Sequence, residues 1–368
     1  MKHCENLPAD RSGGNGSGHG SASTEGERHA GPRTLDLYCG GGGSSWGARM
    51  AGAEIVCGVD FWPLATQVYA DNFPGAKAVT ARLEATTGPG ILGDIGPVDL
   101  LLASPECTSH TCARGNRARL EESRETALHV LNFVRAFRPR WIVIENVIHM
   151  RSWARYKEFI SALREHFNLR EFVLDAALFG VPQSRKRLFI VGDRVREVPD
   201  IAGTSQAGAA ATVIDQKNGW RTSPLFSPKR AAPTLARAMR AVDALGEGVP
   251  FLIVYYGTDG AGGWQPLDRP LRTLTTLDRF GLVEWESGAP VMRMLQVPEL
   301  TRAMGFGDEY RLLHGTRRDR IKLLGNAVCP PVVQAIIERL TNGDQPGEVG
   351  KPPLRDKGAA LPNKRSPP

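Results

Sequence analysis

The stretch from Asp36 to Gly47 reads Asp-Leu-Tyr-Cys-Gly-Gly-Gly-Gly-Ser-Ser-Trp-Gly, so four successive glycines follow a short apolar run. Glycine lets the backbone pass close to a ligand and adopt conformations that other residues disfavour. Such a loop between a strand and a helix is typical of a site for a nucleotide-like cofactor. Taken alone, the pattern also fits a glycine-rich turn between two core elements.

A second apolar run, residues 55–59, ends at Asp60, twenty positions after Gly40. A carboxylate at the end of the neighbouring strand can accept hydrogen bonds from ribose hydroxyls, so the two segments together predict an adenosine site. A nicotinamide dinucleotide is disfavoured, because the third glycine of its fingerprint would fall on Ser45 or Trp46. S-adenosylmethionine fits this pattern better.

Polar groups recur where the later apolar runs begin or end. Residues 99–103 run into Ser-Pro-Glu-Cys-Thr at 104–108, residues 141–144 run into Glu-Asn-Val at 145–147, and Gln-Ser-Arg-Lys-Arg at 183–187 precedes the run 188–191. In open α/β sheets, functional groups gather just beyond strand ends. Between 34 and 192 these runs alternate with helical stretches, which predicts a parallel sheet with helices on both faces.

These motifs resemble, in their order, those of the DNA cytosine-5 methyltransferase family. The resemblance includes the glycine loop, Pro-x-Cys, Glu-Asn-Val, Gln-x-Arg-x-Arg, Arg-Pro-Leu-Arg-Thr at 269–273 and Gly-Asn-Ala-Val at 325–328, and it covers roughly residues 33–340. Any one motif is weak, but six in order argue against coincidence. The resemblance implies an α/β, Rossmann-like S-adenosylmethionine-dependent methyltransferase sheet with an inserted smaller target-recognition domain. It also implies DNA methylation, as in restriction-modification systems.

Changes in composition and in the apolar pattern along the chain predict its domain organisation. We expect a disordered tail over 1–31, a catalytic cofactor-binding domain over 32–192, a smaller target-recognition domain over 193–314, a segment over 315–341 that returns to the catalytic domain, and a disordered tail over 342–368. The run from Leu323 to Leu340 has an apolar helical pattern. The basic stretch from Arg221 to Arg240, with Lys229, Arg230 and Arg237, predicts phosphate contacts, and Tyr255, Tyr256 and Trp264 offer either groove contacts or a small aromatic core.

Composition agrees with this reading. The chain has 46 basic and 39 acidic residues, a net charge of +7 and a pI near 9.2, which permits a nucleic-acid partner. None of the six cysteines forms a CxxC pair, so we expect neither a metal site nor structural disulfides. We expect a cytoplasmic protein without a membrane partner, because no signal-peptide core is visible. The expected partner is double-stranded DNA, bound by a monomer, and the resemblance allows a cognate restriction endonuclease.

Cys107 is the candidate nucleophile. Cytosine C5 reacts poorly with a methyl donor until a thiolate adds at C6, and cysteine is suited to that addition. A free cysteine is often just a small buried residue, but Cys107 follows a predicted strand end and precedes polar residues. Glu145 is the candidate group near N3 of the base, where a carboxyl group can donate or share a proton. By resemblance, Arg187 contacts the cytosine carbonyl and Arg185 a phosphate or the catalytic loop.

The donor site is expected to draw on the glycine loop, the segment around Asp60, the Pro-x-Cys motif and the Gly-Asn-Ala-Val motif. The candidate residues are Asp36, Tyr38, Cys39, Gly40, Gly42, Asp60, Phe61, Pro105, Asn326 and Val328, of which Asn326 matches the asparagine that the family places near the methionine end of the cofactor. The polar segment from Thr108 to Arg119 is suited to closing over a base that has been rotated out of the duplex.

Two departures from the family pattern keep alternatives open. Glu106 stands where the family usually has proline, and it either disfavours the Cys107 thiolate or contacts an unusual base or a larger transferable group. Residues 80–84 lack the acidic residue that commonly contacts adenine. The alternatives are the same chemistry on RNA or on a premodified pyrimidine, and a DNA-binding relative without catalysis.

Overall fold

The computed structural model describes residues 31–106, 121–203, 205–215, 219–256 and 262–342. Residues 1–30 and 343–368 of the two expected tails, Cys107 and the segment from Thr108 to Arg119 lie outside the described residues. The elements that form the two sheets and their helices, in chain order, are β1 (Arg33–Leu37), α1 (Gly43–Met50), β2 (Glu54–Asp60), α2 (Pro63–Asn72), β3 (Lys77–Thr80), β4 (Leu100–Ala103), α3 (Glu121–Phe137), β5 (Trp141–Asn146), α4 (Tyr156–Arg164), β6 (Asn168–Asp175), β7 (Lys186–Asp193), β8 (Ser223–Pro224), α5 (Ala232–Leu245), β9 (Phe251–Val254), β10 (Trp264–Pro266), β11 (Phe280–Glu286), β12 (Ala289–Met294), α6 (Val297–Ala303), α7 (Arg317–Asn326) and α8 (Pro330–Thr341). Short 3-10 helices cover 89–92, 148–152, 176–179 and 210–213.

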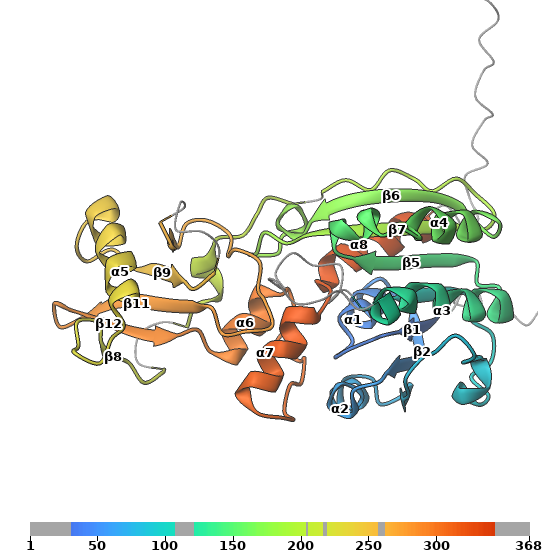
Figure 1. Cartoon of the computed structure of the whole chain (residues 1–368), viewed down its shortest axis with the longest axis horizontal. Coiled ribbons are helices and arrows are strands. Elements are labelled where there is room, and N and C mark those ends of the chain that lie inside the picture. The colour runs from blue at the N-terminus through green and yellow to red at the C-terminus, as the bar shows by residue number, and fades with distance from the viewer. Residues whose placement is uncertain (1–30, 107–120, 204, 216–218, 257–261, 343–368) are drawn as a thin grey trace, which may run out of the picture. The chain divides into compact units, whose positions relative to one another are not determined.

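The larger sheet has seven strands in the order β3-β2-β1-β4-β5-β7-β6 (Figure 1). Strands β1 to β5 pair in parallel, which confirms most of the predicted parallel sheet. The prediction is wrong for β7, which pairs antiparallel with both β5 and β6. The chain between β6 and β7, residues 176–185, holds only a short 3-10 helix, and a parallel return would require a longer crossover.

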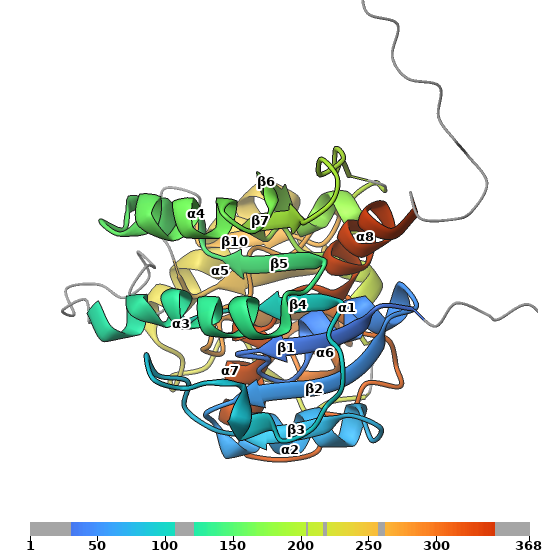
Figure 2. The same cartoon turned by 90° about the vertical axis from the view of Figure 1, so that its right-hand side faces the viewer.

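Helices cover both faces of this sheet, as predicted. The strands alternate between two cores: Leu100 and Leu102 of β4 join the core with Trp46 of α1 and Ile336 of α8, whereas Leu101 joins the other core. That second core contains the buried side of α3 and α4, and Figure 2 shows these two helices together on one face of the sheet. Side chains of successive strand residues point to opposite faces, so one strand serves both cores.

A smaller antiparallel sheet has the order β10-β9-β11-β12-β8. Its own core contains Phe251, Ile253 and Val283 with Ala238 and Ala241 of α5. Tyr255 and Trp264 pack against this core, and Tyr256 donates a hydrogen bond to the Thr273 carbonyl at 2.9 Å. These three aromatic residues therefore contribute to packing.

The end of the chain packs on the larger sheet. The helical pattern over Leu323–Leu340 forms two helices rather than one, because α7 ends at Asn326 and Pro330 and Pro331 begin α8. The region 317–341 is long and apolar enough to be considered for a membrane span, but most of its apolar window is buried inside the protein. Packing against α1 and the sheet makes it part of the core.

Candidate donor and base site

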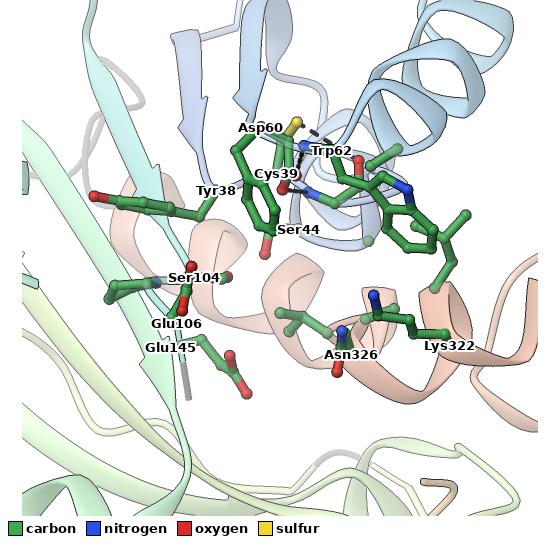
Figure 3. Close-up of a pocket in the computed structure, with 18 residues that line it drawn as sticks. Tyr38, Cys39, Ser44, Asp60, Trp62, Ser104, Glu106, Glu145, Lys322 and Asn326 are labelled. Carbon is green, nitrogen blue, oxygen red and sulfur yellow. Dashed lines mark hydrogen bonds between the residues drawn. The ribbon is translucent and has the colours of Figure 1, made fainter. Parts of the chain in front are cut away.

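Strand order places one pocket at the carboxyl edge of the larger sheet. The order reverses between β1 and β4, and open α/β sheets bind ligands at such a reversal. A cavity with about 1010 Å³ of empty space, open to solvent, lies there. It is lined by Tyr38, Cys39, Gly40, Gly43, Ser44, Asp60, Phe61, Trp62, Ala65, Ser104, Pro105, Glu106, Glu145, Lys322, Leu323, Asn326, Ala327 and Val328 (Figure 3). Residues that follow β1, β2 and β4, the end of β5 and the end of α7 therefore meet in one cavity.

The glycine loop is shaped by close packing as well as by positive φ angles. Gly42 has φ 88° and precedes the first turn of α1, a conformation that residues with a Cβ rarely adopt. At Gly43, a Cβ atom would meet the Val328 carbonyl oxygen at 2.4 Å. The loop after β1 and the segment after α7 therefore touch directly, and this contact forms one wall of the cavity.

Asp60 holds the other side of the loop. Its Oδ2 accepts a hydrogen bond from the Gly40 N–H at 3.0 Å, and its Oδ1 accepts one from the Trp62 N–H at 2.9 Å. Burial raises the pKa of Asp60, and these backbone hydrogen bonds oppose the rise. Carboxylate oxygens have further acceptor positions, so Asp60 in the cavity wall can still bind a diol such as ribose.

Asp36 lies beneath the loop and does not line the cavity. It is fully buried, its Oδ2 accepts a hydrogen bond from Ser45 Oγ at 2.7 Å, and Ser45 Oγ is 2.8 Å from Tyr69 Oη. Asp36 Oδ1 has no hydrogen-bond partner among the described residues. Burial raises the pKa of Asp36 to about 7, and the hydrogen bonds from Ser45 limit the rise.

The raised pKa of Asp36 predicts a pH-dependent stability. The folded-state pKa of about 7 exceeds the ordinary 3.8, so protonated Asp36 stabilises the folded protein. This contribution is fully present below pH 3.8 and is lost as pH rises through 7. A shift of this size corresponds to at most about 4 kcal/mol in the free energy of unfolding. We expect Asp36→Asn to remove this decline, measured as urea unfolding across a pH series. Asp94→Asn, at an exposed site, should keep the wild-type slope, and an equally steep decline in Asp36→Asn would contradict the expectation.

Asn146 and Thr126 anchor the segment that precedes Cys107, and Tyr38 bonds to Thr126. Tyr38 has a φ of 58°, unusual for a residue with a side chain, and its hydroxyl donates to the Thr126 carbonyl at 2.8 Å. Asn146 Nδ2 donates to the Pro105 carbonyl at 3.0 Å, and the Glu106 N–H donates to Thr126 Oγ1 at 3.2 Å. Pro105 and Glu106 are thus held by β5 on one side and by α3 on the other.

Glu145 and Arg187 form an ion pair at the same edge of the sheet. Arg187 Nε lies 3.2 Å from Glu145 Oε1, and both side chains are largely buried. Burial raises the pKa of Glu145, and the charges of Arg187 and then Arg185 oppose that rise. A carboxyl group with a raised pKa beside an arginine is a candidate for proton transfer.

Arg185 takes part in packing. Its guanidinium is buried and donates to the Leu274 carbonyl at 2.9 Å and to the Gly325 carbonyl at 2.8 Å. Gln183, from the same motif, accepts from the Leu274 N–H at 2.8 Å and donates to the Ala303 carbonyl at 3.0 Å. Through these hydrogen bonds, the Gln-x-Arg-x-Arg motif before β7 holds three other segments in place. They are the segment after β10 that carries Leu274, the end of α6 and the end of α7.

Several cavity residues were not among the predicted site residues. Trp62 and Lys322 face each other, with Lys322 Nζ 4.3 Å from the centre of the Trp62 ring. Lys322 precedes Asn326 by one helical turn, a spacing that could have predicted its place in the wall. Tyr310 braces the glycine loop through a hydrogen bond to the Gly41 carbonyl at 2.8 Å, and no local pattern indicates that contact.

The segment that lacks the family's acidic residue lies beside Phe61. The Arg82 guanidinium carbon is 5.2 Å from the centre of the Phe61 ring, which is partly exposed in the cavity wall. A cation over an aromatic face is a favourable arrangement. Phe61 therefore contributes an aromatic ring to the cavity wall, and Arg82 supports that ring from outside the wall.

The fold and the site together describe a methyltransferase of the Rossmann-like class. The sequence model of the C-5 cytosine-specific DNA methylase family matches residues 32–222 and 272–342. Type II methyltransferase M.HgiDI of Herpetosiphon aurantiacus is 34% identical over 231 residues, which cover 58% of this chain and 74% of that protein. The human tRNA (cytosine(38)-C(5))-methyltransferase is 29% identical over 165 residues, which cover 43% of this chain and 41% of that protein.

A solved structure supports the fold independently. The S. pombe Dnmt2 methyltransferase superposes with a TM-score of 0.60 at 19% identity, over 85% of this chain and 99% of that chain. With the family match, this confirms the α/β methyltransferase fold with a second, smaller antiparallel sheet. The chain belongs to the C-5 cytosine-specific DNA methylase family. It is a DNA cytosine-5 methyltransferase, and members of this family use S-adenosylmethionine as the methyl donor.

Proposed function

We propose that the protein methylates C5 of a cytosine rotated out of double-stranded DNA, through a covalent adduct with Cys107. The observation that carries this proposal is the meeting, in one cavity, of the Asp60 carboxylate, the Glu145 carboxyl group and the Pro105-Glu106 segment that leads into Cys107. A base within a duplex cannot reach such a cavity without being extruded.

The residues of the donor wall fit S-adenosylmethionine. Asp60 offers acceptor positions for a ribose diol, the glycine loop allows close backbone approach, and Asn326 lies across the cavity beside Ala327 and Val328 (Figure 3). When bound, the donor supplies the methyl group as a sulfonium, which leaves as a neutral thioether. Tyr38, Cys39, Gly40, Phe61 and Pro105 complete this wall, whereas Asp36 and Gly42 act by holding the loop.

On the base side of the cavity, different side chains carry out the steps of the reaction on cytosine. The Cys107 thiolate adds to C6, Glu145 holds the N3 side with a shared proton, and the electron pair that reaches C5 forms the new bond to the methyl carbon. Loss of the C5 proton to a base and expulsion of the thiolate then restore the aromatic ring. We propose that Arg187 orients Glu145 and contacts the base carbonyl, and that buried Arg185 fixes the segments that carry Leu274 and Gly325.

Bisulfite sequencing of DNA from cells that express the protein tests this proposal. Methylated cytosines at one recurrent short sequence are expected, and their absence on expression of Cys107→Ser is the control. RNA is the second candidate substrate, because a human tRNA methyltransferase is among the relatives. Protected cytosines in the RNA of the same cells, with unmodified DNA, would contradict the DNA proposal and favour RNA.

Further partners follow from the relatives and the charge. M.HgiDI is named as a type II methyltransferase, so we propose a role in restriction-modification with a cognate endonuclease, action as a monomer on DNA and a place in the cytoplasm. The +7 net charge suits a polyanionic substrate.

DNA affinity should depend steeply on salt through the basic stretch 221–240. Arg221, Lys229 and Arg240 are exposed there, and each phosphate contact contributes about one unit to the slope of log affinity against log salt concentration. We expect Arg221→Gln with Lys229→Gln to lower the magnitude of that slope by about two units in binding titrations. Lys157→Gln on α4 serves as the exposed control, and a slope that is the same in all three proteins would contradict phosphate contact by this stretch.

A further inference from the structure

Glu106 adds a carboxylate to a cavity wall whose described charges are already mostly acidic. Asp60, Glu106 and Glu145 line the cavity together with one cationic residue, Lys322. Glu145 is paired with Arg187, and the Asp60 oxygens accept backbone hydrogen bonds. A ligand that enters this cavity therefore meets a field that favours positive charge.

The backbone fixes where Glu106 stands. Its N–H donates to Thr126 Oγ1, a hydrogen bond that proline at this position could not make, and the preceding Pro105 carbonyl accepts from Asn146 Nδ2. Both anchors belong to regular elements, α3 and β5. The half-buried side chain is thus presented to the cavity from a rigid support.

The charge of Glu106 acts on the donor side of the cavity. Burial is the largest cause of the raised pKa of Tyr38, and the charge of Glu106 is the second largest. The same charge also contributes to the raised pKa of Asp60. The charges that act on Glu145, at the base side, are those of Arg187 and Arg185. Glu106 therefore lies within electrostatic reach of two residues of the donor wall, Tyr38 and Asp60.

The chemistry of transfer locates the donor's positive charge near Glu106. Cys107, the proposed nucleophile, follows Glu106 directly in the sequence. A methyl group that moves to a base bound at Cys107 must start close to that residue, so the sulfonium must lie at the Glu106 end of the donor wall. Lys322 lies on α7 beside Trp62, in another part of the wall (Figure 3).

We propose that Glu106 is a specificity residue that distinguishes the sulfonium donor from its thioether product by electrostatic attraction to the positively charged sulfur. The donor and S-adenosylhomocysteine share the adenosine, the ammonium and the carboxylate, and they differ in the methyl group and its sulfonium charge. A carboxylate beside the sulfur therefore strengthens donor binding and leaves product binding nearly unchanged. The result is weaker product inhibition after each methyl transfer. This inference rests on the proposed use of S-adenosylmethionine.

Calorimetric titration of the full-length protein with each compound, without DNA, tests the proposal apart from catalysis. In Glu106→Gln we expect affinity for S-adenosylmethionine to fall about tenfold, equivalent to about 1.4 kcal/mol, and affinity for S-adenosylhomocysteine to change less than about twofold. Glu165→Gln, a carboxylate outside the cavity wall, should match the wild type for both. Lys322→Gln should leave the ratio of the two affinities unchanged, because both ligands carry the carboxylate that a lysine can attract.

Equal losses for both compounds in Glu106→Gln, or no loss for either, would overturn the proposal. An unchanged affinity ratio combined with a changed preference between plain and premodified DNA would overturn it in favour of base recognition. Glu106→Asp keeps the charge and withdraws it by one methylene, so a partial fall in the ratio is expected even if Glu106→Gln unfolds. A wild-type protein that binds both compounds but methylates no DNA would contradict the proposed function while leaving this inference intact.

Discussion

Cys107→Ser is expected to abolish methyl transfer, lowering the rate by at least about a thousandfold, because a serine hydroxyl is a far weaker nucleophile toward C6 than a thiolate. DNA with 5-fluorocytosine at the target should trap the wild-type enzyme, since fluorine replaces the proton whose loss permits elimination of the thiolate. A stable protein-DNA adduct visible after denaturing electrophoresis is the measurement.

The serine variant also provides the control for folding. It should bind S-adenosylmethionine with wild-type affinity while forming no adduct with the fluorinated DNA. Cys39→Ser, at a buried cysteine of the cavity wall, should retain adduct formation. Substantial methylation by Cys107→Ser would reject the covalent mechanism, and adduct formation lost only in Cys39→Ser would assign the nucleophile to that residue.

Glu145→Gln is expected to lower the single-turnover rate by about 10²- to 10⁴-fold, the range found when a positioned acid-base group is removed. Burial raises the pKa of Glu145, so the protonated form persists to higher pH than for an exposed carboxyl group. If the protonated form assists at N3, the wild-type rate falls as pH rises through that pKa, and Glu145→Gln lacks this fall.

Arg187→Gln separates the acid-base role from simple loss of the ion pair. It removes the charge that most opposes the raised pKa of Glu145, so the alkaline fall in rate should move to higher pH. An identical alkaline limb in wild type, Glu145→Gln and Arg187→Gln would show that Glu145 does not control the proton.

The sequence predicted those parts of the fold that depend on local pattern. The glycine loop and the apolar runs before Asp60 and Glu145 are found in the structure, because period and turn residues specify them over a few positions. The antiparallel direction of β7 was missed, since strand partners are chosen by packing across the whole sheet. The break between α7 and α8 was also missed, although Pro330 and Pro331 marked it.

The candidate site shows the same division. Asp60, Glu145 and Asn326 each lie at or next to the end of an element within a recognisable motif, and all three line the cavity. Asp36 was expected to bind the donor, but it is buried below the loop. Successive residues of a strand face opposite sides of the sheet, and the short run that forms β1 does not indicate which side faces the cavity. The contact from Tyr310 to Gly41 joins positions far apart in the chain, so no local signal indicates it.

The contact of Gly43 with Val328 has a consequence for protein synthesis. One part of the donor cavity comes from residues 38–65, and the part that touches it through Val328 comes from residues 322–328, which are synthesised only after the smaller sheet. Domains form from the N-terminus during translation, so the nascent larger sheet waits without α8 while the smaller sheet is made. Its apolar surface around Trp46 and Ala48, which α8 later covers, then needs protection from aggregation. A truncated product that ends before Arg317 would be unable to bind the donor and would depend on chaperones.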